Sequence, residues 1–208
     1  MKEINNKTWF YLCVVTGILG ILFYTLSTLG SFPFKVSYLM FMHTGIFISL
    51  SISFLYRITI KSIPNFPYQL GLLFLFCAGI IHSIMACMQG SNRAWYNGQG
   101  ENVDREILTG IFSSQLGVDF TFDMLISMGL FFLCLGFLLA SKLHKAITIS
   151  GMIVSIGGYS VNALSFPSNP GNSGWVDPGP FFSLWFFVFV VALIRDFYHT
   201  HKIHNNDT

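Results

Sequence analysis

Residues 117–129 read G-V-D-F-T-F-D-M-L-I-S-M-G, a stretch apolar enough to cross a bilayer that nevertheless carries two carboxylates. Asp119 and Asp123 are four residues apart, so on a helix they share one face. A charged side chain inside a membrane is costly, and such residues usually face a protein interior or a water-filled cavity. The stretch therefore predicts a membrane-spanning helix with a functional polar face.

The rest of the chain is equally apolar. Apolar residues make up 53% of the sequence and charged residues 10%, so we expect the lipid bilayer to be its main solvent. A net charge of +2 without a dense basic run gives no support for a nucleic-acid partner. The four cysteines lie in predicted spans and lack the spacing of a zinc or redox motif, so we expect no disulfide.

Six segments reach or approach the ~20 apolar residues needed to cross ~30 Å of hydrocarbon. We therefore predict an all-α fold, a polytopic membrane bundle of six transmembrane helices that forms a single domain over residues 1–208. Only residues 141–145 separate the fourth span from the fifth, which predicts a tight antiparallel hairpin. The predicted spans are 9–29, 36–56, 69–88, 118–140, 146–166 and 181–198, and residues 199–208 form a tail.

Basic residues divide unequally between the two sides of this bundle. Eight Lys and Arg fall on one side and three on the other, which predicts that both termini and the tail are cytoplasmic. The expected location is the cell (cytoplasmic) membrane. The long connections 89–117 and 167–179 then lie outside. In the first of them, Asn102 can cap a short amphipathic helix, which we expect to lie in the headgroup region or to cover the bundle.

The intramembrane polar residues gather in the outer half of the predicted bundle. His43 and His82 lie at similar depth on the second and third spans, and a stripe of small residues along the fifth span brings Asn162 level with the two aspartates. The hypothesis is an outward-open, ligand-binding polar pocket, covered by the two long connections. Its proposed lining is His43, His82, Asp119, Asp123 and Asn162.

Each of these residues also has a purely structural interpretation. Asp119 is near enough to a helix N-terminus to be a hydrated carboxylate that the macrodipole favours. Either histidine can be a core side chain satisfied by a carbonyl, and Asn162 can be a hydrogen-bond pin between helices. The common depth of the residues is what favours a shared site.

Three functions fit this pattern. In the first, the pocket binds, or helps to move, a small molecule or cation. In the second, the protein is a membrane scaffold or partner-binding subunit without chemistry of its own. In the third, two His and two Asp hold a metal and hydrolyse a substrate at the outer leaflet, although no spacing such as H-E-x-x-H supports it.

The inner half of the predicted bundle offers only small polar groups such as Ser, Thr and Cys. Conduction across the membrane would therefore require a pore at the axis of a homo-oligomer. The sequence names no cofactor, no metal and no catalytic residue.

Overall fold

The computed structural model describes the backbone of residues 6–99, 105–168 and 173–206, and the side chains of 7–96, 106–168 and 173–196. Within these ranges the chain forms six α-helices and no strand. Each helix is long and apolar enough to cross a membrane, which confirms the all-α prediction and fits a multi-pass membrane protein. The helices are α1 (Asn6–Leu29), α2 (Phe34–Thr59), α3 (Phe66–Gln99), α4 (Arg105–Ala140), α5 (Lys145–Ser165) and α6 (Gly179–Asn206).

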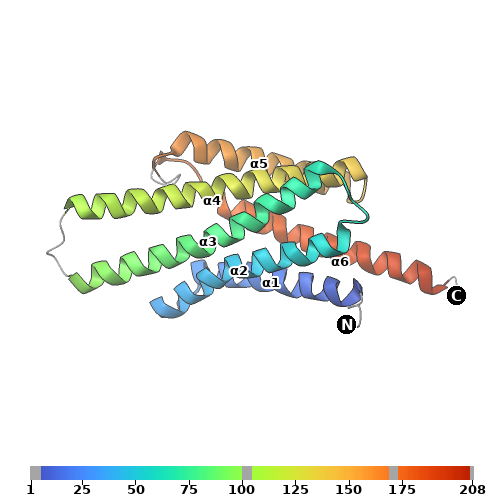
Figure 1. The fold of residues 1–208 in the computed structure, drawn as a ribbon, viewed down its shortest axis with the longest axis horizontal. Helices are drawn as coiled ribbons and strands as arrows, with labels where there is room; N and C mark the ends of the chain where they lie inside the picture. Colours follow the sequence, from blue (N-terminus) through green and yellow to red (C-terminus); the bar gives the residue numbers. More distant parts are fainter. Residues whose placement is uncertain (1–5, 100–104, 169–172, 207–208) are drawn as a thin grey trace.

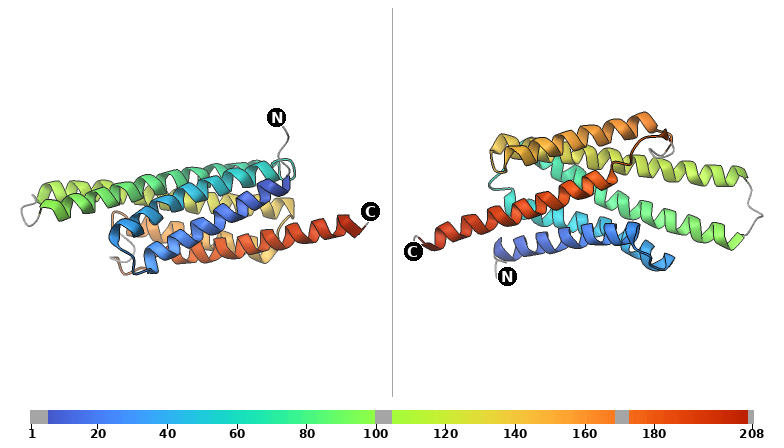
Figure 2. Two further views of the ribbon diagram at one scale, coloured as in Figure 1. Left: turned by 90° about the horizontal axis from the view of Figure 1, so that it is seen from below. Right: turned by 180° about the vertical axis from the view of Figure 1, so that it is seen from behind.

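The six helices form a closed ring in the order of the chain. Each packs against the next, and α6 closes the ring against α1 (Figure 1). Seen from behind, α6 runs between α5 and α1 (Figure 2). Over the described residues, α6 makes no close backbone contact with α2 or α4. The helix backbones therefore leave a space inside the ring, which side chains fill only in part.

The close approach of α2 to α3 depends on two facing glycines. A Cβ atom at Gly45 would collide with the carbonyl oxygen of Gly79, and one at Gly79 would lie 2.6 Å from the carbonyl oxygen of Gly45. One turn further on, Ser83 Oγ donates a hydrogen bond of 2.9 Å to the carbonyl of Met42. Contacts between small residues are how helices commonly associate in membranes. Here they fix which residues of α3 face α2.

Helices α3 and α4 are longer than a membrane requires. They contain 34 and 36 residues, and at ~1.5 Å per residue each is about 50 Å long, more than the ~40–45 Å of a bilayer with its headgroups. Both project beyond the other helices at one end of the bundle, called here the α3–α4 end (Figures 1 and 2). There Asn92 Nδ2 donates a hydrogen bond of 3.2 Å to Gln115 Oε1. α1 begins and α6 ends at the opposite end of the bundle.

A separate interfacial helix in the third connection is not confirmed. Residues 105–117 are helical, but they form the first turns of α4, which continues through Gly117 without interruption. Glycine permits a turn but does not impose one, and a Cβ atom at Gly117 would meet nothing within 4 Å. The expected cap, Asn102, lies outside the described residues. The connection of 29 residues predicted between the third and fourth spans is thus mostly helix.

The predicted hairpin between the fourth and fifth spans is present. α4 ends at Ala140 and α5 begins at Lys145. Ser141 adopts a left-handed φ of 51°, which turns the chain, and the His144 side chain accepts a hydrogen bond of 3.3 Å from the backbone N–H of Ala146. The hairpin sets α5 antiparallel to α4 and fixes their register.

The stripe of small residues on α5 is its buried face. Gly151, Ser155, Gly158 and Asn162 all belong to it. The short hairpin favours α4 as the partner of the stripe, and the stripe faces α6 as well. A Cβ atom at Gly151 would lie against both Cys134 of α4 and the ring of Trp185 of α6. The stripe therefore lets bulky side chains of α6 approach α5.

Candidate ligand pocket

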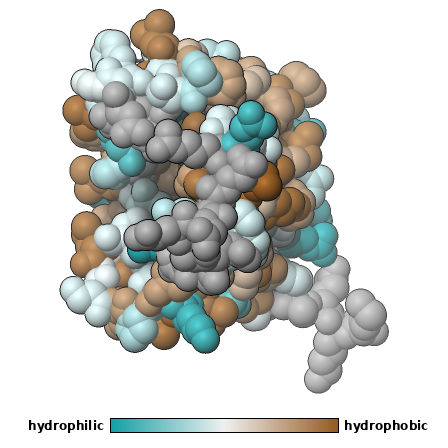
Figure 3. All heavy atoms as spheres, turned by 90° about the vertical axis from the view of Figure 1, so that its left-hand side faces the viewer, coloured by the Kyte–Doolittle hydropathy of each residue, from teal (hydrophilic) through white to brown (hydrophobic). Residues whose placement is uncertain are grey.

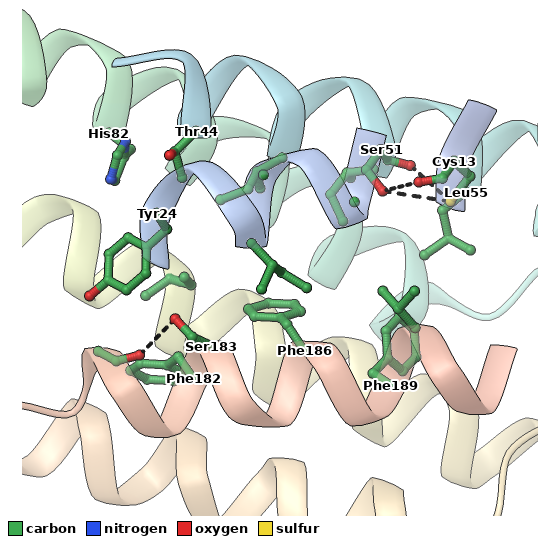
Figure 4. A pocket seen from close by; sticks show the side chains of 18 of the residues that line it. Cys13, Tyr24, Thr44, Ser51, Leu55, His82, Phe182, Ser183, Phe186 and Phe189 are labelled. Carbon is green, nitrogen blue, oxygen red and sulfur yellow. Dashed lines mark hydrogen bonds between the residues drawn. The ribbon is translucent and has the colours of Figure 1, made fainter. Parts of the chain in front are cut away.

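Four polar side chains from four helices line one pocket inside the ring. They are Tyr24 of α1, Thr44 of α2, His82 of α3 and Asp123 of α4, and together they are called the polar layer. Tyr24, Thr44 and His82 lie at the same end of the pocket (Figure 4), and the start of α6 lies there too: a Cβ atom at Gly179, the first residue of α6, would lie 2.7 Å from Tyr24 Oη. Sequence positions as far apart as 24 and 179 thus meet at one end of the pocket.

His82 is the most unusual member of the polar layer. Only 1% of its surface is exposed, yet neither ring nitrogen has a hydrogen-bond partner among the described residues. The rings of Phe41 and Phe122 lie edge-on to it, with centroids 4.5 and 5.0 Å away. Its side chain points from α3 into the pocket, towards Tyr24 (Figure 4). A buried core histidine would ordinarily be hydrogen-bonded, so this geometry favours a role towards the pocket.

Carboxylates gather around the same end of the pocket. Asp123 lines it, Asp119 lies one turn away on α4, and Asp177 accepts a hydrogen bond of 2.8 Å from the backbone N–H of Gly179. The three aspartates lie close enough to act on one another electrostatically, and all three act on the Tyr24 phenol. The described residues that line the pocket include no Lys or Arg. Carboxylates are thus the principal ionisable groups at this end of the pocket.

Beyond the polar layer the pocket continues between α1, α2 and α6 as an apolar slot (Figure 4). Its polar groups are engaged locally: Ser51 Oγ donates a hydrogen bond of 2.9 Å to the carbonyl of Cys13. The space between the lining residues is about 970 Å³, which includes the gaps between atoms and space open to the surroundings. The walls of the slot include Ile21, Ile48, Ile52, Phe186, Phe189 and Val190.

The α3–α4 end of the molecule carries a mixed surface. Hydrophilic residues occur on several parts of this end, between hydrophobic ones (Figure 3). Trp95 and Phe112, on the projecting parts of α3 and α4, are 38% and 52% exposed. Tryptophan is enriched where a membrane meets water. The polar layer lies towards this end of the bundle, because Tyr24 is beside Gly179, where α6 begins.

The structure brings some of the sequence-predicted site residues together. His82 and Asp123 share the pocket, and Asp119 lies beside it. His43 does not belong to the lining, because its Nδ1 atom lies 2.7 Å from the carbonyl oxygen of Leu39 on its own helix. Its neighbour Thr44 faces the pocket instead.

Asn162 reaches the expected level but not the pocket. It lies 17 residues after the start of α5, and Asp123 lies 17 residues before the end of α4, so the hairpin places them at the same height. Asn162 is 3% exposed, and its Nδ2 atom has no hydrogen-bond partner among the described residues. It lies on the face of α5 that packs against its neighbours and does not line the pocket.

Three residues of the site were missed by sequence reasoning: Tyr24, Thr44 and Asp177. Asp177 carried a readable signal, because it lies immediately before the Pro-Gly-Pro that precedes the predicted sixth span, at the same end of the bundle as Asp119. Thr44 and Tyr24 carried none. Threonine and tyrosine occur at many positions of the apolar helices, and only the packing of the ring selects these two.

The metal-dependent interpretation finds no matching geometry in the part of the chain that the structure describes. No three His, Cys, Asp or Glu side chains are arranged there to hold a metal ion. Cys13, the cysteine in the pocket lining, lies at the opposite end of the pocket from His82 (Figure 4). The arrangement is instead suited to recognition, since an imidazole both donates and accepts and a carboxylate accepts.

No protein-family model, no curated protein and no solved structure matches this chain. The chemistry of the pocket is therefore the basis for inferring its function. That chemistry combines one hydrogen-bonding end that carries carboxyl groups with a long apolar body.

Proposed function

We propose that this protein binds a small molecule in the pocket of the ring, with the polar part of the ligand held by His82 and Asp123. The observation that carries the proposal is His82, buried and aimed into the pocket with both ring nitrogens unpartnered among the described residues. Leaving a buried polar group without a hydrogen bond costs about 1–3 kcal/mol. A ligand that bonds to His82 would offset that cost.

The form of the pocket supports the same proposal. Ligand sites are mostly apolar concavities with a few convergent polar groups that fix orientation, and this pocket has that composition. By the positive-inside rule we place the α3–α4 end outside the cell and both termini in the cytoplasm. The polar layer would then recognise a ligand from the outer half of the membrane.

The proposal is tested by what remains bound to the purified protein. The full chain is purified in mild detergent, the bound small molecules are extracted, and they are identified and quantified by mass spectrometry. We expect one compound at close to one copy per chain. Its amount should fall at least about tenfold in Asp123→Asn and in His82→Phe, because each change removes a charge-assisted or buried hydrogen bond.

Two matched variants serve as controls. Glu106→Gln removes a carboxylate from the same helix as Asp123, but at an exposed site in its first turn. His43→Phe removes the histidine that lies outside the pocket lining. Both should retain the compound within about twofold. A wild-type protein that carries no stoichiometric compound, or equal amounts in all five proteins, would overturn the proposal and favour the scaffold function.

A further inference from the structure

The pocket that carries the proposed function also indicates the class of its ligand. We propose that the ligand is an amphiphile with one apolar chain and an ammonium head, the head lying at the polar layer and the chain in the apolar slot. This inference rests on the proposed function and adds the charge of the head and the presence of a chain. Each addition has its own structural reason.

The charge of the head follows from the groups around the polar layer. Asp119, Asp123 and Asp177 act on one another electrostatically, and the described residues of the pocket lining include no Lys or Arg. Carboxylates in a membrane usually pair with a cation or face a water-filled cavity. His82 supplies the second, independent sign of a ligand, because its ring nitrogens have no partner among the described residues and face the same space. An ammonium group donates up to three hydrogen bonds, which both a carboxylate oxygen and an unprotonated imidazole nitrogen can accept.

The chain follows from the length of the slot. Along α2 the lining runs from Thr44 to Leu55 and along α6 from Gly179 to Leu193, which at ~1.5 Å per residue is about 16 and 21 Å. Half of a ~30 Å hydrocarbon core is about 15 Å. The slot is thus about as long as one leaflet is thick. A compact polar cation would fill only the end of the pocket at the polar layer.

The walls of the slot agree with such an occupant. Phe182, Phe186 and Phe189 of α6 line it at intervals of three and four residues, on one face of the helix. Gly17 and Gly20 of α1 also belong to the lining. A Cβ atom at Gly17 would lie 3.1 Å from Ser51 Oγ and 3.6 Å from a methyl carbon of Val190, so α1 approaches its neighbours closely along the slot. The aromatic face and the glycine face together form a narrow channel suited to one chain.

The test uses a defined probe with the full chain in phosphatidylcholine nanodiscs. The probe is a C16 primary amine with a photoreactive diazirine near the end of the chain, and its adducts are mapped by mass spectrometry. We expect adducts on the residues of α1 and α6 that line the slot. Unlabelled C16 amine should remove them, whereas C16 alcohol and ethylamine at the same concentration should not.

Two pairs of variants separate the head from the chain. Asp123→Asn should lower the adduct yield at least about tenfold, while Glu106→Gln changes it by less than about twofold. Val190→Phe should block the slot with a similar loss, because Val190 lines it. Val191→Phe adds the same group at a neighbouring position that is 50% exposed and outside the pocket lining, and should have little effect.

The outcomes distinguish this inference from the proposed function. If C16 alcohol competes as well as the amine, the charged head is wrong. If ethylamine competes as well and Val190→Phe has no effect, the chain is wrong, although a small molecule still binds. If no specific adducts form in the slot, the proposal of an amphiphilic ligand is wrong. The proposed binding function is tested separately, by whether the purified protein carries a bound compound.

Discussion

At the scale of single residues, the central observation is the difference between His43 and His82. Both are histidines at similar depth in an apolar helix, and the sequence offers no reason to prefer one. The contact between Gly45 and Gly79 fixes how α2 and α3 face each other. As a result His43 bonds to its own helix, while His82 points into the pocket. Such a distinction depends on the rotation of a helix about its axis, which an apolar pattern does not define.

Replacement of His82 by phenylalanine should separate stability from function. The substitution removes two buried nitrogens that have no partner among the described residues, at a site flanked by Phe41 and Phe122. We expect His82→Phe to raise the free energy of unfolding by about 1–3 kcal/mol while the bound compound is lost. Thermal unfolding of the ligand-free protein in detergent measures the first effect. His43→Phe is the control, and a destabilised His82→Phe protein would mean that the histidine is a packing residue.

At the scale of helices, the sequence predicted which helices are present more accurately than where each helix begins and ends. Apolar runs identified all six helices, and the short hairpin between α4 and α5 follows from the few residues available. The same runs underestimated α3 and α4, because an apolar window detects only the part of a helix that lies in lipid. Outside it, backbone hydrogen bonds and contacts such as Asn92 with Gln115 continue the helix. The amphipathic pattern before the fourth span indicated a helix, and residues 105–117 are helical, but the pattern did not indicate that this segment continues into the span.

Close contact between α2 and α3 should be sensitive to a single methyl group. In Gly45→Ala the added carbon meets the Gly79 carbonyl and the Ser83 backbone, neither of which is a flexible side chain. We expect a loss of about 1–3 kcal/mol in stability. The control is Gly157→Ala, an exposed helical glycine whose added carbon meets nothing within 4 Å. It should be neutral or stabilising by up to about 1 kcal/mol, and equal unfolding temperatures for the two variants would contradict the close contact.

At the scale of the whole molecule, function depends on the closure of the ring. The contact of α6 with α1 closes the ring around an interior space. Side chains of α2 and α4 line this space, while the described backbones of α2 and α4 make no close contact with α6. The sequence predicted the depth of the polar residues from alternating spans, and the register of the helices gives Asp123 and Asn162 a common level. It predicted that all five residues line one pocket, whereas only His82 and Asp123 do so, because the order and rotation of helices around a ring are set by long-range packing. Asp177 and Tyr24 join the site only through that closure.

The most direct test of this account is whether the pocket admits a small molecule at all. Single cysteines are introduced at Thr44 and Ser183, which line the pocket, and at Ser127 and Ser155, which do not. Thr44, Ser127 and Ser155 are each 1% exposed, so the comparison separates contact with the pocket from surface exposure. The background has its four native cysteines replaced by alanine, and labelling by a methanethiosulfonate ethylammonium reagent is followed by mass spectrometry. We expect positions 44 and 183 to react at least about tenfold faster than 127 and 155, because buried side chains away from a cavity react only when the structure opens locally. Equal protection at all four positions would contradict an accessible pocket, and with it the binding function.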